Sequence, residues 1–291
     1  MLPRRHIRIK VFQTLYANSQ HAKDSNFNVK KEFEKNLKGY LNLHKIIINF
    51  LLEFKEVAIS HINIRKAQMI RLNKELKPNT KFIENIFIKQ LKGKKKIQIE
   101  DHKINTIVKK EFKKLQKSKY YIKYMNKSVK SNAEDKKMIL YLIKKHIVIN
   151  EKIHDLIEDY SIYWNDDILL IYNFLIEQIN NNQSINHIKI FRKKEDEEFS
   201  HLLLKTTIIK EEEVTQIIYD LVKNWDEERI AISDLILMQM AISELKYIPN
   251  IPHNVTLDEY IEISKEYSSP KSKEFINGIL DVFIKEILTR K

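Results

Sequence analysis

A scarcity of turn-forming residues limits the folds open to this chain more than any other feature. Its 291 residues include only three glycines (Gly39, Gly93 and Gly278) and five prolines. Sandwiches and barrels need many short turns, and phosphate-cradling loops need closely spaced glycines. Neither GxGxxG nor GxxxxGK[ST] occurs. The sequence therefore predicts an all-α fold, and 43% hydrophobic residues suffice for a packed core.

The chain is strongly basic, with 52 Lys and Arg against 39 Asp and Glu and a formal charge of +13. This balance favours an anionic partner, above all nucleic acid, although a codon bias toward Lys, Ile and Asn would give the same total. Cysteine is absent, which excludes disulfides, thiolate nucleophiles and Cys-ligated zinc. The longest apolar runs, such as residues 46–54, are too short to span a bilayer. We therefore expect a cytoplasmic protein.

Apolar residues recur at helical spacing over residues 30–72, 132–160 and 168–179. Between the first two of these stretches, residues 73–131 are rich in lysine and only weakly periodic. Such a segment fits either a solvated helical arm or a partly ordered insertion. NNNQS at residues 180–184 is the clearest internal break.

The last helix predicted from the sequence carries an unusual first turn. Ser269 and Pro270 suit the N-cap and the first helical position. Lys271 and Lys273 then place cations where the helix dipole disfavours them, whereas free backbone N–H groups beside two ammonium groups would favour a phosphate. Phe275 follows one turn later. Its ring would either fill the core or stack on an unpaired base.

Arg4, Arg5 and Arg8 form a second basic group at the start of the chain. They share one side of a predicted helix, since neighbours at i, i+3 and i+4 lie on one face. Without further context, such a group is typical of a solvated basic terminus.

Three segments within residues 224–281 resemble the C-terminal domain of the NusB family of bacterial transcription antitermination factors: NWDEERIAISDLILMQMAISEL, IPHNVTLDEYIEIS and SSPKSKEFINGILD. The arginine-rich start, followed by Gln13, Leu15 and Tyr16, resembles the first helix of that family. The resemblance implies a NusB-like helical bundle with additional helices inserted after the first. We expect an N-terminal Arg-rich helix over residues 1–22, a helical, Lys-rich insertion over 23–190 and a C-terminal NusB-like domain over 191–291.

The resemblance also implies a function, namely RNA binding in transcription antitermination on ribosomal RNA operons. In this family the arginine-rich start and the first turn of the last helix hold boxA-type single-stranded RNA. The partners implied are NusE, a small-subunit ribosomal protein, and indirectly other Nus factors and RNA polymerase. No catalysis, cofactor or metal is implied. The candidate RNA-binding residues are Arg4, Arg5, Arg8, Lys271, Ser272, Lys273 and Phe275.

Other positions match the family pattern and are interpreted as structural: Trp225, Arg229, Asp234, Glu244, Pro252, Glu259, Asn277, Gly278 and Asp281. Among them, Gly278 is expected to permit close helix packing, and Thr256 with Glu259 has the spacing of a capping box. The chain departs from the pattern at Glu274, where some members carry Lys, and at Lys271, where an acidic residue is common. RNA sequence preference is therefore less well defined than RNA binding.

Two alternatives remain open at this point. The first is a non-catalytic helical scaffold that retains the NusB fold without specific RNA binding, which the acidic Glu274 and the large insertion favour. The second is a di-iron carboxylate bundle enzyme, because Glu151 and His154, and likewise Glu198 and His201, have the Glu-x-x-His spacing used by such sites, with Glu56 as a further ligand. Chance alone is expected to produce about one such pair in a chain of this composition.

Overall fold

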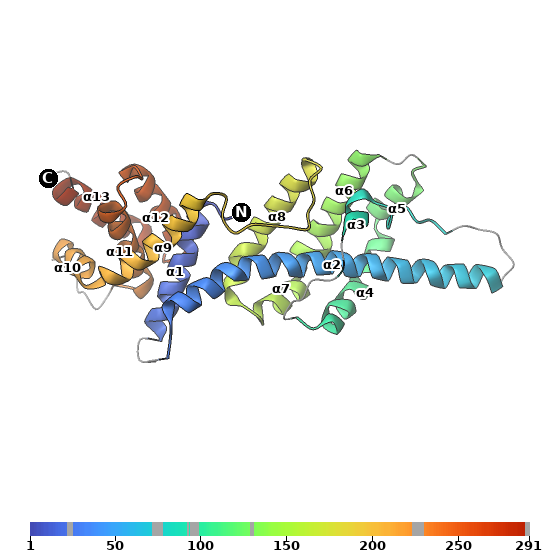
Figure 1. Cartoon of the computed structure of the whole chain (residues 1–291), viewed down its shortest axis with the longest axis horizontal. Helices are drawn as coiled ribbons and strands as arrows, with labels where there is room; N and C mark the ends of the chain where they lie inside the picture. Colours follow the sequence, from blue (N-terminus) through green and yellow to red (C-terminus); the bar gives the residue numbers. More distant parts are fainter. Residues whose placement is uncertain are drawn as a thin grey trace. The chain divides into compact units, whose positions relative to one another are not determined.

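The structure is a computed structural model that describes residues 1–21, 26–71, 78–91, 93, 99–128, 131–222 and 230–288. These residues form helices and connecting turns, with no strand among them, which confirms the predicted all-α fold. Contacts divide the chain into two compact units (Figure 1). Residues 1–37 and 191–291 form the first, here called the terminal unit, and residues 38–190 form the second, the insertion unit.

The terminal unit unites the two ends of the sequence. Helix α1 (Arg4–Gln20) packs against three helices that follow the insertion, namely α9 (Lys194–Ile209), α11 (Ile232–Tyr247) and α12 (His253–Tyr267) (Figure 1). The first turns of α2 (Val29–Arg71), together with α10 (Glu211–Leu221), α13 (Ser272–Phe283) and the π-helical turn η4 (Ile284–Leu288), complete it.

Helix α11 is the centre of this unit. All its residues from Ile236 to Leu245 are buried, as expected of a helix that other helices surround. Helix α1 packs against it, and all residues of α1 from Ile7 to Leu15 are buried. The first helix is therefore a full member of this core. Trp225 and Arg229, expected to be structural, lie outside the described residues.

The insertion unit has its own core. Besides the rest of α2 it contains α3 (Ile86–Gln90), α4 (Asp101–Lys117), α5 (Lys119–Asn126), α6 (Asn132–Ile143), the π-helical turn η1 (Lys144–Val148), α7 (Glu151–Glu158), the 3₁₀ turn η2 (Ile162–Trp164) and α8 (Asn165–Asn180). Phe54, Phe82, Phe112 and Tyr121 form an aromatic cluster inside it. The described part of the Lys-rich segment thus contributes three packed helices, α3, α4 and α5, with Phe112 only 1% exposed.

Gly39 illustrates how closely the insertion unit packs. A Cβ atom at this position of α2 would lie 2.8 Å from Nε1 of Trp164, so only glycine fits without a shift of the indole. Among the described helices, none is both long enough and apolar enough to cross a membrane.

Candidate nucleic-acid interface

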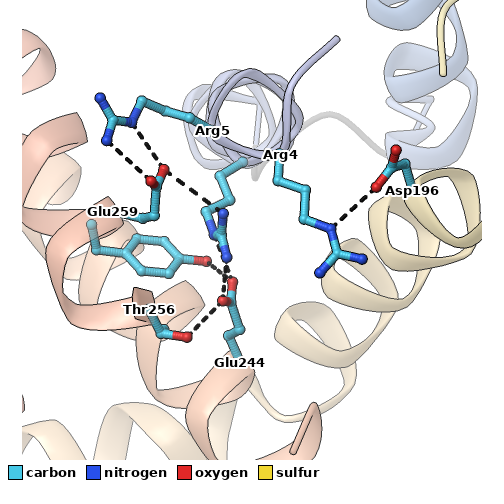
Figure 2. A network of polar contacts seen from close by, with 8 residues as sticks. Arg4, Arg5, Asp196, Glu244, Thr256 and Glu259 are labelled. Carbon is cyan, nitrogen blue, oxygen red and sulfur yellow. Dashed lines mark hydrogen bonds and ion pairs between the residues drawn. The ribbon is translucent and has the colours of Figure 1, made fainter. Parts of the chain in front are cut away.

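The first two turns of α1 direct three arginines toward carboxylates of three different helices (Figure 2). Arg4 Nε lies 3.1 Å from Oδ1 of Asp196 on α9. Arg5 binds Glu259 on α12 through two hydrogen bonds, of 2.9 and 3.0 Å. The spacing of the arginines thus fixes the position of α1 against the helices that follow the insertion.

Arg8 is an interior residue. Its side chain is 2% exposed, and it donates two hydrogen bonds, of 2.9 and 2.5 Å, to the fully buried carboxylate of Glu244 on α11. The hydroxyls of Thr256 and Tyr260 donate to the same carboxylate at 2.8 and 3.0 Å. Burial opposes the charge of Arg8, yet the hydrogen bond and the charge of Glu244 leave its pKa raised. Arg8 therefore closes a buried network and is almost inaccessible to solvent.

Thr256 was expected to cap α12 together with Glu259, and this expectation is wrong. Helix α12 begins at His253 after Pro252, so Thr256 lies within its first turns. The Thr256 hydroxyl is buried against Glu244, and Glu259 holds Arg5. Both residues serve contacts between helices.

Arg4 and Arg5, in contrast, stay accessible. Their side chains are 45% and 43% exposed, whereas the carboxylates that they bind, Asp196 and Glu259, are 14% and 20% exposed. The guanidinium of Arg4 also lies 5.2 Å from the ring centroid of Phe199. Both guanidinium groups are therefore accessible to a phosphate from the solvent side.

Two open hollows border these arginines. One, of about 490 Å³, is lined by Arg4, Arg5, Ile251 and Val255 among others. The other, of about 620 Å³, is lined by Arg4, Arg192 and Lys193 among others. Arg192 and Lys193 were not singled out in the sequence, although the run FRKK immediately before α9 contains them.

The second basic group lies at the start of α13. This helix begins at Ser272, so that Lys271, and not Ser269, occupies the N-cap, with no side-chain capping bond. Ser272 is 5% exposed, and its hydroxyl lies 2.8 Å from that of Ser269. Lys271 and Lys273 are exposed, and Phe275 is half-buried. The first turn of α13 therefore presents two ammonium groups and an aromatic ring to the surface.

The expectation that Gly278 permits close packing within the chain is wrong. The residue is exposed, and a Cβ atom built there would meet no atom within 4 Å. Asn277 and Asp281, on the same helix, are half-buried, and Asp234 on α11 is buried. Nothing in the described fold accounts for a glycine in the middle of α13.

Both basic groups border α12. The pKa of Glu262 on this helix is lowered, first by a hydrogen bond from Lys265 and further by the charges of Arg5 and Lys273. Arg5 from α1 and Lys273 from α13 are thus close enough to act on one carboxylate. Helix α12 contacts both α1 and α13, the two helices whose first turns carry the basic groups.

The two Glu-x-x-His pairs take part in ordinary contacts. Glu151 is exposed, and the Nε2 atom of His154 lies against the carbonyl oxygen of Val148. His201 Nε2 lies 3.7 Å from a carboxylate oxygen of Glu34. Within the described residues, no three or more His, Cys, Asp or Glu side chains are grouped so that they could hold a metal ion.

Comparison with known proteins adds a family to this geometry. The model of the NusB family matches residues 165–285. The transcription antitermination protein NusB of Bacillus mycoides (strain KBAB4) is 40% identical over 87 residues, which are 30% of this chain and 67% of that protein. The proteins of the same name from Bacillus cereus (strain B4264) and Bacillus thuringiensis (strain Al Hakam) are 39% identical over the same shares. No solved structure matches the chain.

Proposed function

The chain belongs to the NusB family of transcription antitermination proteins, and from this premise we propose that it is a non-catalytic, RNA-binding antitermination factor. In this proposal it binds boxA-type single-stranded RNA together with NusE in the cytoplasm. The complex acts, through other Nus factors and RNA polymerase, on elongation along ribosomal RNA operons. The matched relatives carry the name of such a protein, which supports the class of function.

The observation that carries the proposal is that α12 packs against both α1 and α13, whose first turns bear the two basic groups. Arg5 and Lys273 come from opposite ends of the sequence, and the charges of both lower the pKa of Glu262 on α12. Their cations, with those of Arg4 and Lys271, would neutralise successive phosphates and release counterions. Ser272 forms the turn that sets these lysines in place, and Phe275 supplies a ring on which an unpaired base can stack. Arg8 acts indirectly, because its buried pair with Glu244 holds α1 in position.

The test is fluorescence anisotropy of boxA and scrambled RNA oligomers with the full chain, with and without NusE, across a salt series. We expect tighter binding of boxA when NusE is present and a negative slope of log K against log salt. Lys273→Gln and Arg5→Gln should weaken the binding. The matched control is Lys205→Gln, an exposed lysine of α9 in the same unit, which should not.

One observation favours the scaffold alternative, in which the fold is retained without specific RNA binding. Arg4 and Arg5 already have carboxylate partners, and the acidic Glu274 is exposed directly before Phe275. Equal and weak binding of boxA and scrambled RNA, unchanged by NusE and by Lys273→Gln, would establish this alternative and exclude the antitermination proposal.

A further inference from the structure

The positive charge of the chain resides in the insertion unit. Residues 38–190 contain 30 Lys and Arg against 16 Asp and Glu, whereas the rest of the chain contains 22 against 23. The excess is concentrated further between residues 103 and 145, where 14 lysines and no arginine accompany three acidic residues. A codon bias would spread over both units, so this distribution calls for a local explanation.

Internal contacts occupy the three acidic residues of this segment. Glu111 is buried and binds Lys114 at 2.7 Å and His146 at 3.1 Å. Asp135 is buried and accepts hydrogen bonds from the Tyr124 hydroxyl, at 2.6 Å, and from a backbone N–H of α3.

The third, Glu134, is shared between Lys127 and Lys81. Two lysines of the same surface, Lys123 and Lys137, are exposed and have no ion-pair partner among the residues that the structure describes. The acidic side chains therefore leave most of the cationic surface uncompensated.

A groove runs between α5 and α6 on this surface. Three residues of α5 and the C-cap residue after it line one wall, at i, i+3, i+4 and i+7. Two residues of α6 line the other, around a volume of about 230 Å³: Tyr120, Lys123, Tyr124, Lys127, Glu134 and Lys137. The groove thus combines ammonium groups with aromatic rings.

Tyr120 forms one end of this α5–α6 groove. Its ring stacks on Tyr141 of α6, with centroids 4.3 Å apart and an interplanar angle of 14°. The stack holds the ring in one orientation, and the residue is still 37% exposed. A flat ring that is already fixed can accept a further planar group with little loss of side-chain entropy.

We propose that the α5–α6 groove binds single-stranded RNA without sequence preference. Lysine ammonium groups neutralise phosphates as point charges and lack the planar fork with which arginine selects partners bidentately. Tyr120 offers a stacking surface that any base can use. This site lies in the other compact unit from the proposed boxA site and does not depend on it, so that one chain carries two separate contacts with RNA.

The first experiment measures oligouridine binding to the full chain by anisotropy across a salt series. Lys123→Gln with Lys137→Gln should weaken binding and make the slope of log K against log salt shallower by about 1.4, because each phosphate contact on a single strand contributes about 0.7. The matched control is Lys66→Gln with Lys152→Gln, two exposed lysines of the same unit outside the groove, which removes the same charge. Equal effects of the two double variants would overturn the proposal.

The second experiment tests the stacking. Tyr120→Ala should weaken oligouridine binding about fivefold to 150-fold, the range for one stacked base, while Tyr120→Phe should bind as the parent does. Circular dichroism and thermal unfolding check that both variants fold. If polyaspartate competes as well as oligouridine and folded Tyr120→Ala binds unchanged, the groove is a general polyanion surface, and the RNA assignment fails.

Variants of the two units separate this inference from the proposed function. Loss of boxA binding in Lys273→Gln, with oligouridine binding lost only in the groove variants, supports two independent sites. If Lys273→Gln abolishes binding of both boxA and oligouridine RNA, and the groove variants alter the binding of neither RNA, the groove proposal is wrong and the antitermination proposal is supported. If only the groove variants reduce RNA binding, and boxA RNA binds no more tightly than oligouridine, the groove proposal is supported and the proposed boxA site is wrong.

Discussion

At the scale of single residues, the three arginines at the start of α1 have two different structural roles. Arg4, Arg5 and Arg8 look equivalent in the sequence, yet Arg8 is buried while the other two are exposed. The difference could not be predicted from the sequence, because the partner of Arg8, Glu244, lies 236 residues further along the chain. The helical spacing predicted one shared face, whereas the three side chains reach carboxylates of three different helices.

Arg8→Met should destabilise the terminal unit by about 3–5 kcal/mol, since it leaves the carboxylate of Glu244 buried without its cation. Denaturant unfolding, followed by a probe in the terminal unit, measures the change. Arg4→Met removes an exposed pair and should cost about 1 kcal/mol or less. Equal losses in the two variants would contradict the assignment of Arg8 as the buried anchor.

Phe275→Ala should weaken RNA binding by about 1–3 kcal/mol, the contribution of one stacked base. Anisotropy with boxA RNA and NusE gives the binding change, and thermal unfolding gives the stability. A variant that binds RNA normally but unfolds at a clearly lower temperature would show that this half-buried ring belongs to the core.

Gly278→Ala separates stability from function. A mid-helix glycine is less stable than alanine by about 0.5–1 kcal/mol, and the added methyl group meets no atom of the described fold, so the variant should unfold at higher temperature. If a ligand or partner approaches the backbone of α13 at this point, binding in the boxA and NusE assay should fall at the same time. An increase in stability with unchanged binding would remove any such role from Gly278.

At the scale of elements, the spacing of apolar residues predicted most helices, whereas local capping patterns gave wrong predictions. Residues Ile104, Val108, Phe112 and Leu115 give α4 a buried stripe, but the lysines around it made the segment look weakly periodic. Thr256 and Glu259 have capping-box spacing, and contacts with other helices use both instead. A capping pattern in the sequence therefore fails to predict the role of a polar side chain when that side chain is buried in a contact with another helix.

The contact between α10 and the end of α11 should give the protein a specific acid response. Hydrogen bonds from Lys246, Tyr247 and Lys210 lower the pKa of Glu213 from the usual 4.5 to about 2. A lowered pKa stabilises the fold above pH 4.5, and the contribution is lost as the pH falls toward 2. Unfolding followed across this pH window should show the loss in the parent protein and a flatter profile in Glu213→Gln.

At the scale of the whole molecule, the two units differ in charge far more than in architecture. Both are helical, yet only residues 38–190 carry a large excess of cations. The motifs of the family fall in the terminal unit, which is why resemblance could predict its candidate site. It could not predict the α5–α6 groove, because the family model begins only at residue 165, after both helices, and the basic surface depends on which acidic residues are internally paired.

This asymmetry predicts a unit-specific response to salt. Like charges repel within the insertion unit, and raising ionic strength shortens the Debye length from about 30 Å at 0.01 M to about 8 Å at 0.15 M. Hydrogen exchange should therefore slow more in α4, α5 and α6 than in α11, α12 and α13 when salt is added. A uniform change across both units would contradict the uneven distribution of uncompensated charge.

The buried pair between Arg8 and Glu244 also has a consequence during synthesis. The ribosome adds about 5–20 residues each second, so Arg8 is incorporated about 12 to 47 s before its partner Glu244. All of residues 38–190 are translated within that interval. Helix α1 therefore lacks its partner α11, and its apolar residues stay exposed, while the insertion unit is synthesised. A nascent chain released before α11 would carry α1 as a cationic segment whose residues Ile7–Leu15 lack the helices that bury them, so the terminal unit can form only after α11 has been made.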